Sequence, residues 1–454
     1  MNKKFFLRLS LNFISQEKEN LFICLFILCA GILFGSSIGI LFTIALILFS
    51  LKRPELTLVL IFFSGFLKNI EVIQSMPIDL TVFAVSLLIL NSCIRILKIG
   101  KLKKLNYLDI LVILQGLLVL FSTAFISSGT WLNWWDAKRF IVFNVFLYMG
   151  LFLLSVKRQE IITIIHWILY GVLVISSSAF HNFIFGKITT WHLGSFGEES
   201  YISIGLLMGL GVLFFLHNIL FIKQDLTRKI LNLILLISLV FMIPFIPSRG
   251  VLISLILAFL LILLRLSWKN RVRLIGVLAV LLIFAFIGMH FANIQGVNVK
   301  RVWSYSGAYA KGITYRINAL KSAVELFIEN PFLGIGMGEF MYLRTGKGSY
   351  PHNLLMESLV SFGVLGIFIF WPSFLISFKN SIVMLKEKNA KKEEVIMSLW
   401  FTFYFFESLV SGSLTEFRTL WLFMGILSIL YYSVRREPIV RLPRRFTPRK
   451  NHIQ

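Results

Sequence analysis

The sequence predicts an all-α fold, a polytopic transmembrane bundle of about 12–14 helices in one integral membrane domain over residues 1–454. Three observations support this class: the composition, the length of the apolar runs and the distribution of charge. Apolar residues occupy 57% of the 454 positions and charged residues only 15%, whereas about a quarter of the residues of a soluble globular chain are charged. A large soluble helical protein would also need polar helix faces, which these runs lack.

Long apolar runs account for the predicted helices in order. A helix needs about 20 apolar residues to cross the hydrocarbon layer, so runs approaching this length indicate spanning segments. The runs are residues 21–51, 110–126, 140–156, 161–180, 202–222, 231–246, 251–264, 275–287, 354–378 and 421–432. The first run is predicted to form two short helices that bend at residues 35–37.

The charge distribution predicts the topology. Most of the 45 Lys and Arg residues lie in gaps that an alternating topology places on one side of the membrane. The positive-inside rule identifies that side as cytoplasmic, which predicts that both termini are cytoplasmic. The net charge of +24 is then explained by topology, and no nucleic-acid partner is predicted. The basic tail over residues 435–454 is expected to lie on anionic membrane lipid.

One predicted extracytoplasmic loop is long, spanning residues 292–353. It contains apolar residues that recur at three- and four-residue steps, which predicts an amphipathic helix. They are Ile313, Ile317, Leu320, Val324 and Phe327. Pro331 should end this helix, because proline forbids its continuation. We expect the helix to lie on the outer surface of the membrane and to cap a cavity.

The remaining basic residues face outward or sit at outer helix ends, against the topological bias. An excess of cations on that side suggests an anionic ligand such as phosphate or pyrophosphate, which guanidinium groups bind with two parallel hydrogen bonds. Lys138 and Arg139, at one such helix end, are candidates for substrate binding. Ordinary pairing with lipid head groups remains the alternative for each of these residues.

Two residues stand out among the candidates. Arg249 lies between two apolar spans with almost no loop, after two prolines and before Gly250. An ionisable group in such a place is a functional candidate, because it can hardly reach bulk water without a cavity. His352 follows Tyr350-Pro351 and, of the seven histidines, it alone lies beside a cluster of outward arginines. It could take a proton from a sugar hydroxyl, and a helix-capping role is the alternative.

Several familiar chemistries are not indicated. The run Gly334-Ile-Gly-Met-Gly338 resembles a phosphate-cradling loop, but it opens no βαβ unit, so a flexible turn is the alternative. The sequence has no Asp-x-Asp pair, no Walker lysine and no His/Cys metal set. We therefore predict no metal and no cofactor. This suits a substrate that already carries a good leaving group, such as a lipid pyrophosphate.

Residues 316–366 and 248–250 resemble the O-antigen ligase and O-antigen polymerase superfamily. The resemblance rests on Arg-x-Asn-Ala-Leu from Arg316, on Glu-Asn-Pro-Phe-Leu-Gly-Ile-Gly-Met-Gly from Glu329, and on His352-Asn353 followed after nine residues by Gly363-x-x-Gly366. A second match is Ser-Arg-Gly around Arg249, before a leucine-rich span. Together these cover about a quarter of the chain, residues 240–370.

The resemblance implies a metal-independent, inverting glycosyltransferase of the bacterial cytoplasmic (inner) membrane, active on the extracytoplasmic face. The donor would be a glycan linked to undecaprenyl diphosphate. The acceptor would be another glycan or lipid A–core, and a chain-length regulator is a candidate partner. Polymerase and ligase activities remain equally open. A lipid-linked oligosaccharide flippase is the alternative, although a flippase would be expected to carry its cations through the midplane of the bundle.

The same resemblance implies roles for particular residues. His352 would activate the acceptor hydroxyl, while Arg249 and Arg316 would hold the pyrophosphate and stabilise it as it leaves. Three further positions within the motifs are assigned to substrate binding: Asn353, Gly336 and Gly338.

Overall fold

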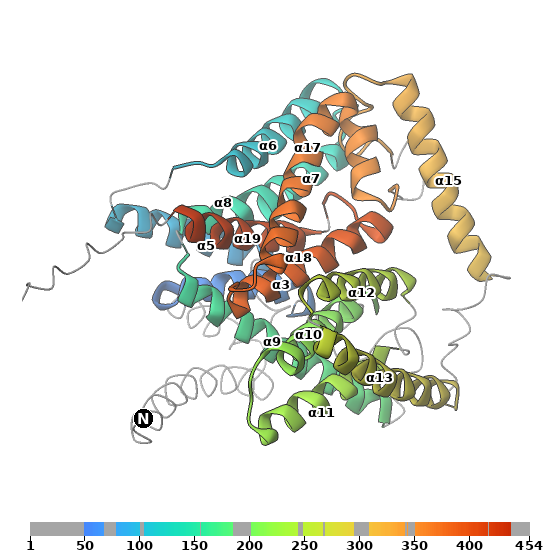
Figure 1. Cartoon of the computed structure of the whole chain (residues 1–454). Helices are drawn as coiled ribbons and strands as arrows, with labels where there is room; N and C mark the ends of the chain where they lie inside the picture. Colours follow the sequence, from blue (N-terminus) through green and yellow to red (C-terminus); the bar gives the residue numbers. More distant parts are fainter. Residues whose placement is uncertain are drawn as a thin grey trace, which may run out of the picture.

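A computed structural model of the chain describes residues 50–67, 79–99, 104–154, 156–184, 201–243, 248–266, 268–294, 308–340, 343, 350–415 and 417–436. These parts are helical and contain no strand, which confirms the predicted all-α class. The helices are α3 (Glu55–Leu67), α5 (Leu80–Ile99), α6 (Tyr107–Phe125), α7 (Trp131–Phe140), α8 (Phe146–Leu153), α9 (Arg158–Ile184), α10 (Tyr201–Phe221), α11 (Leu226–Met242), α12 (Arg249–Ile262), α13 (Trp268–Ile294), α15 (Ala308–Glu329), α17 (Leu354–Lys386), α18 (Lys392–Ser411) and α19 (Arg418–Arg436) (Figure 1).

Six of these helices, α5, α6, α9, α10, α13 and α17, are long and apolar enough to cross a membrane. Helices α3 and α19 contain shorter apolar stretches. One turn of π-helix, Ile141–Val145, joins α7 to α8 without a break. The chain is thus a multi-pass helical bundle, and the number of 12–14 spans stays a prediction. The predicted helix pair within 21–51 and most of the basic tail over 435–454 lie outside the described residues.

Helix α18 lies at the centre of the bundle and packs against α17, α12, α19 and α10 (Figure 1). Large aromatic rings fill the surrounding core: the ring centroids of Trp400 and Phe423 are 5.6 Å apart, and those of Phe374 and Trp421 are 5.4 Å apart. Gly209 of α10 allows close approach, because a Cβ there would lie 2.4 Å from the ring of Phe403. Close packing of this kind, through small residues, holds helices together where lipid removes most of the hydrophobic driving force.

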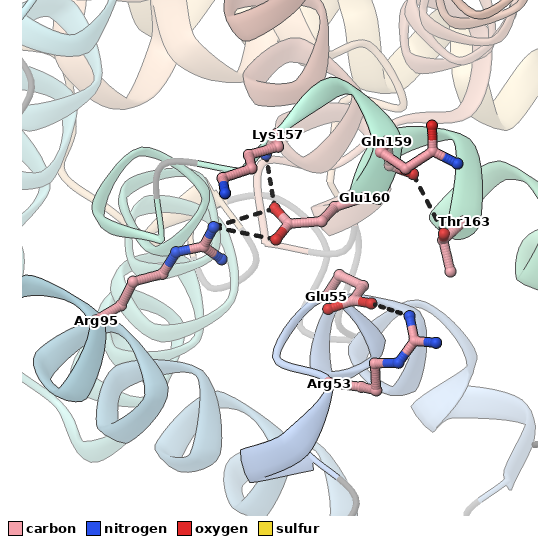
Figure 2. A network of polar contacts seen from close by, with 7 residues as sticks. All are labelled: Arg53, Glu55, Arg95, Lys157, Gln159, Glu160 and Thr163. Atoms are coloured by element: carbon pink, nitrogen blue, oxygen red, sulfur yellow. Dashed lines mark hydrogen bonds and ion pairs between the residues drawn. The ribbon is translucent and has the colours of Figure 1, made fainter. Parts of the chain in front are cut away.

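The gaps predicted to be cytoplasmic meet at one face of the bundle. Arg95 of α5 donates to the Glu160 carboxylate of α9 at 3.0 Å, and the Arg53 guanidinium lies 3.1 Å from Glu55 (Figure 2). Arg158 pairs with Glu394 at the start of α18, 2.7 Å away. These ion pairs join α5, α9 and α18 at the same end of the molecule, as an alternating topology requires.

Helix α17 reverses direction within its length. Gly363 has φ 60° and ψ −145°, which breaks the helix there. The Trp371 indole N–H donates to the carbonyl of Leu355 at 3.3 Å and to Ser358 Oγ at 3.1 Å, whereas residues 16 positions apart in one straight helix are about 24 Å apart. A short first arm therefore folds back along a long second arm. Gly366 permits this contact, because a Cβ there would lie 2.2 Å from the carbonyl oxygen of Ser358.

Helix α15, in gold along one side of the bundle in Figure 1, forms and ends where the sequence predicts. It packs against α17, with Ala319, Ala323 and Leu326 buried in one cluster. Two members of the predicted apolar stripe are instead exposed, Ile317 by 48% and Val324 by 44%. Part of the predicted stripe is therefore not covered by the protein, as expected of a helix on a membrane surface.

Candidate functional site

The last turn of α18 is the meeting point of the residues that the sequence singles out. Its carbonyl groups lack partners within the helix, and the negative end of the helix dipole favours cations there. Arg316 Nη1 donates to the carbonyl of Val410 at 3.2 Å, and Asn353 Nδ2 donates to that of Leu409 at 2.8 Å. The structure thus brings α15 and the segment before α17 to one helix end.

His352 has a strained backbone and an unusual environment. Its φ is 55°, the only positive value at a non-glycine position among the described residues, and such a conformation costs about 1 kcal/mol or more for a side chain of this kind. The ring is half-buried between two tyrosines, its centroid 4.3 Å from that of Tyr350 and 6.0 Å from that of Tyr315. Among the described residues, its buried Nδ1 has no hydrogen-bond partner. Strain and an unsatisfied nitrogen together are typical of a functional site.

Burial and the nearby positive charge of Arg316 lower the pKa of His352 from 6.5 to about 4. The imidazole is therefore neutral near pH 7 and has a lone pair available to accept a proton. The effect of Arg316 on this pKa also places the guanidinium within electrostatic range of the ring. The predicted base and one predicted pyrophosphate ligand thus share one environment.

Asn353 has a structural role that accounts for its place after His352. Its side-chain oxygen accepts from the amide of Met356 at 3.0 Å and so caps the N-terminus of α17. Its side-chain nitrogen binds the end of α18, as described above. Asn353 therefore fixes His352 between two helix ends, and direct contact of Asn353 with substrate stays a prediction.

Arg249 begins α12, where Ser248 caps the helix by accepting from the amide of Val251. The backbone of the next residue, Gly250, lies against the carboxylate of Glu407 on α18: a Cβ there would be 2.7 Å and 2.8 Å from its two oxygens. Sequence reasoning missed Glu407, although an acidic residue within the apolar stretch 395–411 is itself a signal of function.

The glycine loop 334–338 is pinned by contacts inside the protein. The amide of Ile335 donates to the carbonyl of Val360 at 3.0 Å, that of Gly336 to Ser361 at 3.1 Å, and that of Met337 to Ser122 Oγ at 3.1 Å. Gly336 and Gly338 have φ of 99° and 79°, which side chains rarely adopt. Their predicted role in substrate binding is untested, and the contacts account for both glycines through packing.

Lys138 and Arg139 lie on α7, which reaches the same glycine loop. The Asn133 side chain of α7 donates to the carbonyl of Met337 at 2.8 Å. Lys138 is exposed and its ammonium lies over the Trp135 ring, 4.8 Å from the centroid. A predicted role for these two bases in binding donor or acceptor remains untested. Within the described residues, His, Cys, Asp and Glu form no group of three that could hold a metal ion.

Comparison with known proteins identifies the central part of the chain. Residues 234–371 match the model of a family described as O-antigen ligase. No match to a curated protein was found. The matched segment contains Arg249, Arg316, His352 and the glycine loop, and it ends before α18. The match confirms the resemblance to the O-antigen ligase and polymerase superfamily, and it indicates a function of that general type.

Proposed function

We propose that the chain is a membrane glycosyltransferase that moves an oligo- or polysaccharide from undecaprenyl diphosphate to an acceptor hydroxyl, and the match of residues 234–371 to an O-antigen ligase family model supports this. The acceptor is a second glycan in a polymerase and lipid A–core in a ligase. The observation that carries this proposal is His352, a neutral, strained histidine that lies beside Arg316 and inside the matched segment.

In the proposed reaction, His352 accepts the proton of the acceptor hydroxyl as the oxygen attacks the anomeric carbon of the donor. The bond between that carbon and the phosphate oxygen breaks, and the lipid diphosphate leaves from the opposite side, so the configuration inverts. Arg249 and Arg316 stabilise the charge that grows on the departing diphosphate, the kind of interaction that is usually the largest catalytic contribution. The proton held by His352 then passes to solvent or to the diphosphate.

The charge of Arg316 couples donor binding to the basicity of His352. In the free protein this charge lowers the pKa of His352. A diphosphate that pairs with Arg316 compensates the positive charge and raises that pKa again. The histidine would therefore become a better base when the donor is bound, so that it accepts a proton from the acceptor hydroxyl at the step where transfer can follow.

Replacing His352 tests the proposal. Since its φ is 55°, His352→Asn is a better variant than His352→Ala, because asparagine tolerates a left-handed backbone. We expect transfer from a lipid-linked glycan to fall by about 10²–10⁴-fold, the usual contribution of a general base. The matched control is His290→Asn on α13, an exposed histidine outside the site. Wild-type transfer by His352→Asn in membranes that contain normal amounts of protein would refute the role of the base.

Dialysis against a chelator tests the proposal that the reaction needs no metal. Two guanidinium groups carry the charge of the leaving diphosphate in this mechanism, so EDTA should leave the rate unchanged within about twofold. The measurement is transfer in EDTA-treated proteoliposomes, with and without added Mg²⁺ or Mn²⁺. A rate that collapses and returns with one of these ions would assign the charge stabilisation to a metal.

A further inference from the structure

Glu407 is a buried carboxylate that the proposed mechanism leaves unused. It lies on α18 with none of its surface exposed. Its Oε2 accepts from Ser254 Oγ of α12 at 3.0 Å, and its Oε1 has no hydrogen-bond partner within the described part of the chain. A carboxylate withdrawn from water is costly unless charge or hydrogen bonds compensate it. A carboxylate at this position therefore needs a partner close by, either a positively charged group or the positive end of a helix dipole.

The first turn of α12 supplies one part of that partner. Gly250, directly after Arg249, lies so close to both carboxylate oxygens that a Cβ there, at 2.7 Å and 2.8 Å, would push the carboxylate aside. The positive end of a helix dipole and its free amides attract an anion at this point. The glycine of Ser-Arg-Gly is thus explained by the approach of Glu407, and the approach fixes where the helix that bears Arg249 begins.

Arg316 supplies the other part. Burial raises the pKa of Glu407 to about 7, and the hydrogen bond from Ser254 and the positive charge of Arg316 act in the opposite direction, toward the ionised form. The guanidinium of Arg316 also donates to the carbonyl of Val410, three residues further along α18. The carboxylate therefore lies between the helix start that carries Arg249 and the guanidinium of Arg316. The backbone that follows Arg249 and the guanidinium of Arg316 thus meet α18 within a single turn of that helix.

We propose that Glu407 is a positioning residue, the buried carboxyl group that holds Arg249 and Arg316 in the arrangement that receives the diphosphate of the donor. This inference rests on the proposed function. Glu407 touches neither substrate nor reacting atoms and acts through the two arginines. Its negative charge also works against an incoming anion, so the benefit of orientation must exceed this repulsion.

Because positioning and repulsion change the affinity for an anion in opposite directions, the direction of the change in Kd tests the inference. Inorganic pyrophosphate is titrated into the purified full-length protein in detergent, and heat of binding gives the Kd. If Glu407 positions the arginines, Glu407→Gln weakens binding about tenfold, the loss expected for one charge-assisted interaction. Glutamine retains the size of the side chain and an oxygen for Ser254. A tighter Kd, or an unchanged one, overturns the inference, because removing a merely repulsive charge can only favour an anion.

A double-mutant cycle separates positioning from a general effect on the fold. In the Arg316→Gln background, Glu407→Gln should change the Kd by less than about twofold, since the group through which it acts is already gone. The control is Glu394→Gln at the opposite end of α18, which pairs with Arg158. Its effect on thermal stability should combine additively with that of Arg316→Gln, and its effect on pyrophosphate binding should be absent. Additive losses for Glu407→Gln would show that it acts through the fold alone.

Two further results distinguish this inference from the proposed function. If the wild-type protein binds no pyrophosphate, the proposed roles of Arg249 and Arg316 fail, and the inference fails with them. If the wild type binds pyrophosphate and Glu407→Gln binds it equally well, only the inference fails. Should Glu407→Gln not insert into the membrane, Ser254→Ala replaces it, because it removes the one hydrogen bond to Oε2. A roughly threefold weaker Kd supports the inference, and an unchanged Kd overturns it.

Discussion

His352 combines features that seldom occur together by chance: a left-handed backbone, a buried and unpaired Nδ1, and a pKa lowered to about 4. Each feature has a local cause. The caps and carbonyl contacts of Asn353 hold the backbone, the rings of Tyr315 and Tyr350 exclude water, and Arg316 adds positive charge. The imidazole is thereby kept neutral, and strain at this residue is compensated by two helix ends.

The lowered pKa of His352 predicts a pH dependence that Arg316 controls. A base with a free-protein pKa of about 4 loses activity only as the pH falls through that value, so kcat/KM should stay level down to about pH 5. In Arg316→Gln the positive charge is gone and the protonated form is less disfavoured, so the acidic limb should move to higher pH. A profile of kcat/KM against pH for both proteins measures the shift. A limb that stays in place would mean that Arg316 does not act on His352.

The sequence points to candidate residues for the site more readily than to their surroundings, and the roles of these candidates stay predictions. His352, Arg249 and Arg316 stand in motifs, so their types and spacing point to them directly. Glu407 stands in no such motif, because its contacts are distant along the chain; Ser254 and Glu407, for example, are 153 positions apart. Only packing of α12 against α18 brings these residues together, and no local pattern encodes that contact.

At the scale of one element, α17 explains the spacing of His-Asn, nine residues, and Gly-x-x-Gly. Nine residues form the short first arm, Gly363 makes the reversal, and Gly366 allows the second arm to touch the first. His352 is consequently held at the open end of a helical hairpin rather than at the end of a single straight span. The sequence predicted a long span here and not the reversal, because a glycine at φ > 0 looks the same in sequence as a glycine in a helix.

The reversal predicts unequal effects for two glycines of similar backbone geometry. Gly363 and Gly129 have φ of 60° and 67°, so alanine costs each about 1 kcal/mol of backbone strain. A Cβ at Gly363 would also lie 2.5 Å from the carbonyl oxygens of Pro331 and Phe332, whereas one at Gly129 would meet nothing within 4 Å.

Gly363→Ala should therefore lower the thermal stability several times more than Gly129→Ala, since rigid backbone cannot move aside as a flexible side chain can. It should also abolish transfer, because the hairpin sets the place of His352. Tm in detergent and transfer in membranes measure the two effects. Equal and small losses for both variants would show that the arms of α17 can separate without harm.

At the scale of the whole molecule, the charge pattern predicts one basic side of the bundle, and the membrane face that this side occupies stays a prediction. The basic gaps converge where Arg95, Glu160 and Glu394 form their ion pairs, and the candidate site gathers around the opposite end of α18. The number of spans could not be predicted as well, because α17 contains a reversal and α7 continues into α8 through a π-turn. Both features change how many crossings a given length of apolar sequence makes.

The separation of the basic end of the bundle from the end that carries the candidate site predicts which positions can be labelled from outside the cell. Lys321 on α15 and Asn389 in the turn between α17 and α18 are both exposed, and single cysteines can be placed there after Cys24, Cys29 and Cys93 are replaced. The α17–α18 turn is rich in lysine, which retains a loop in the cytoplasm. A membrane-impermeant maleimide should therefore label Lys321→Cys in intact cells or spheroplasts, and Asn389→Cys only after the membrane is opened. Labelling in the reverse order would place His352 and its arginines on the cytoplasmic side, and it would exclude transfer on the extracytoplasmic face.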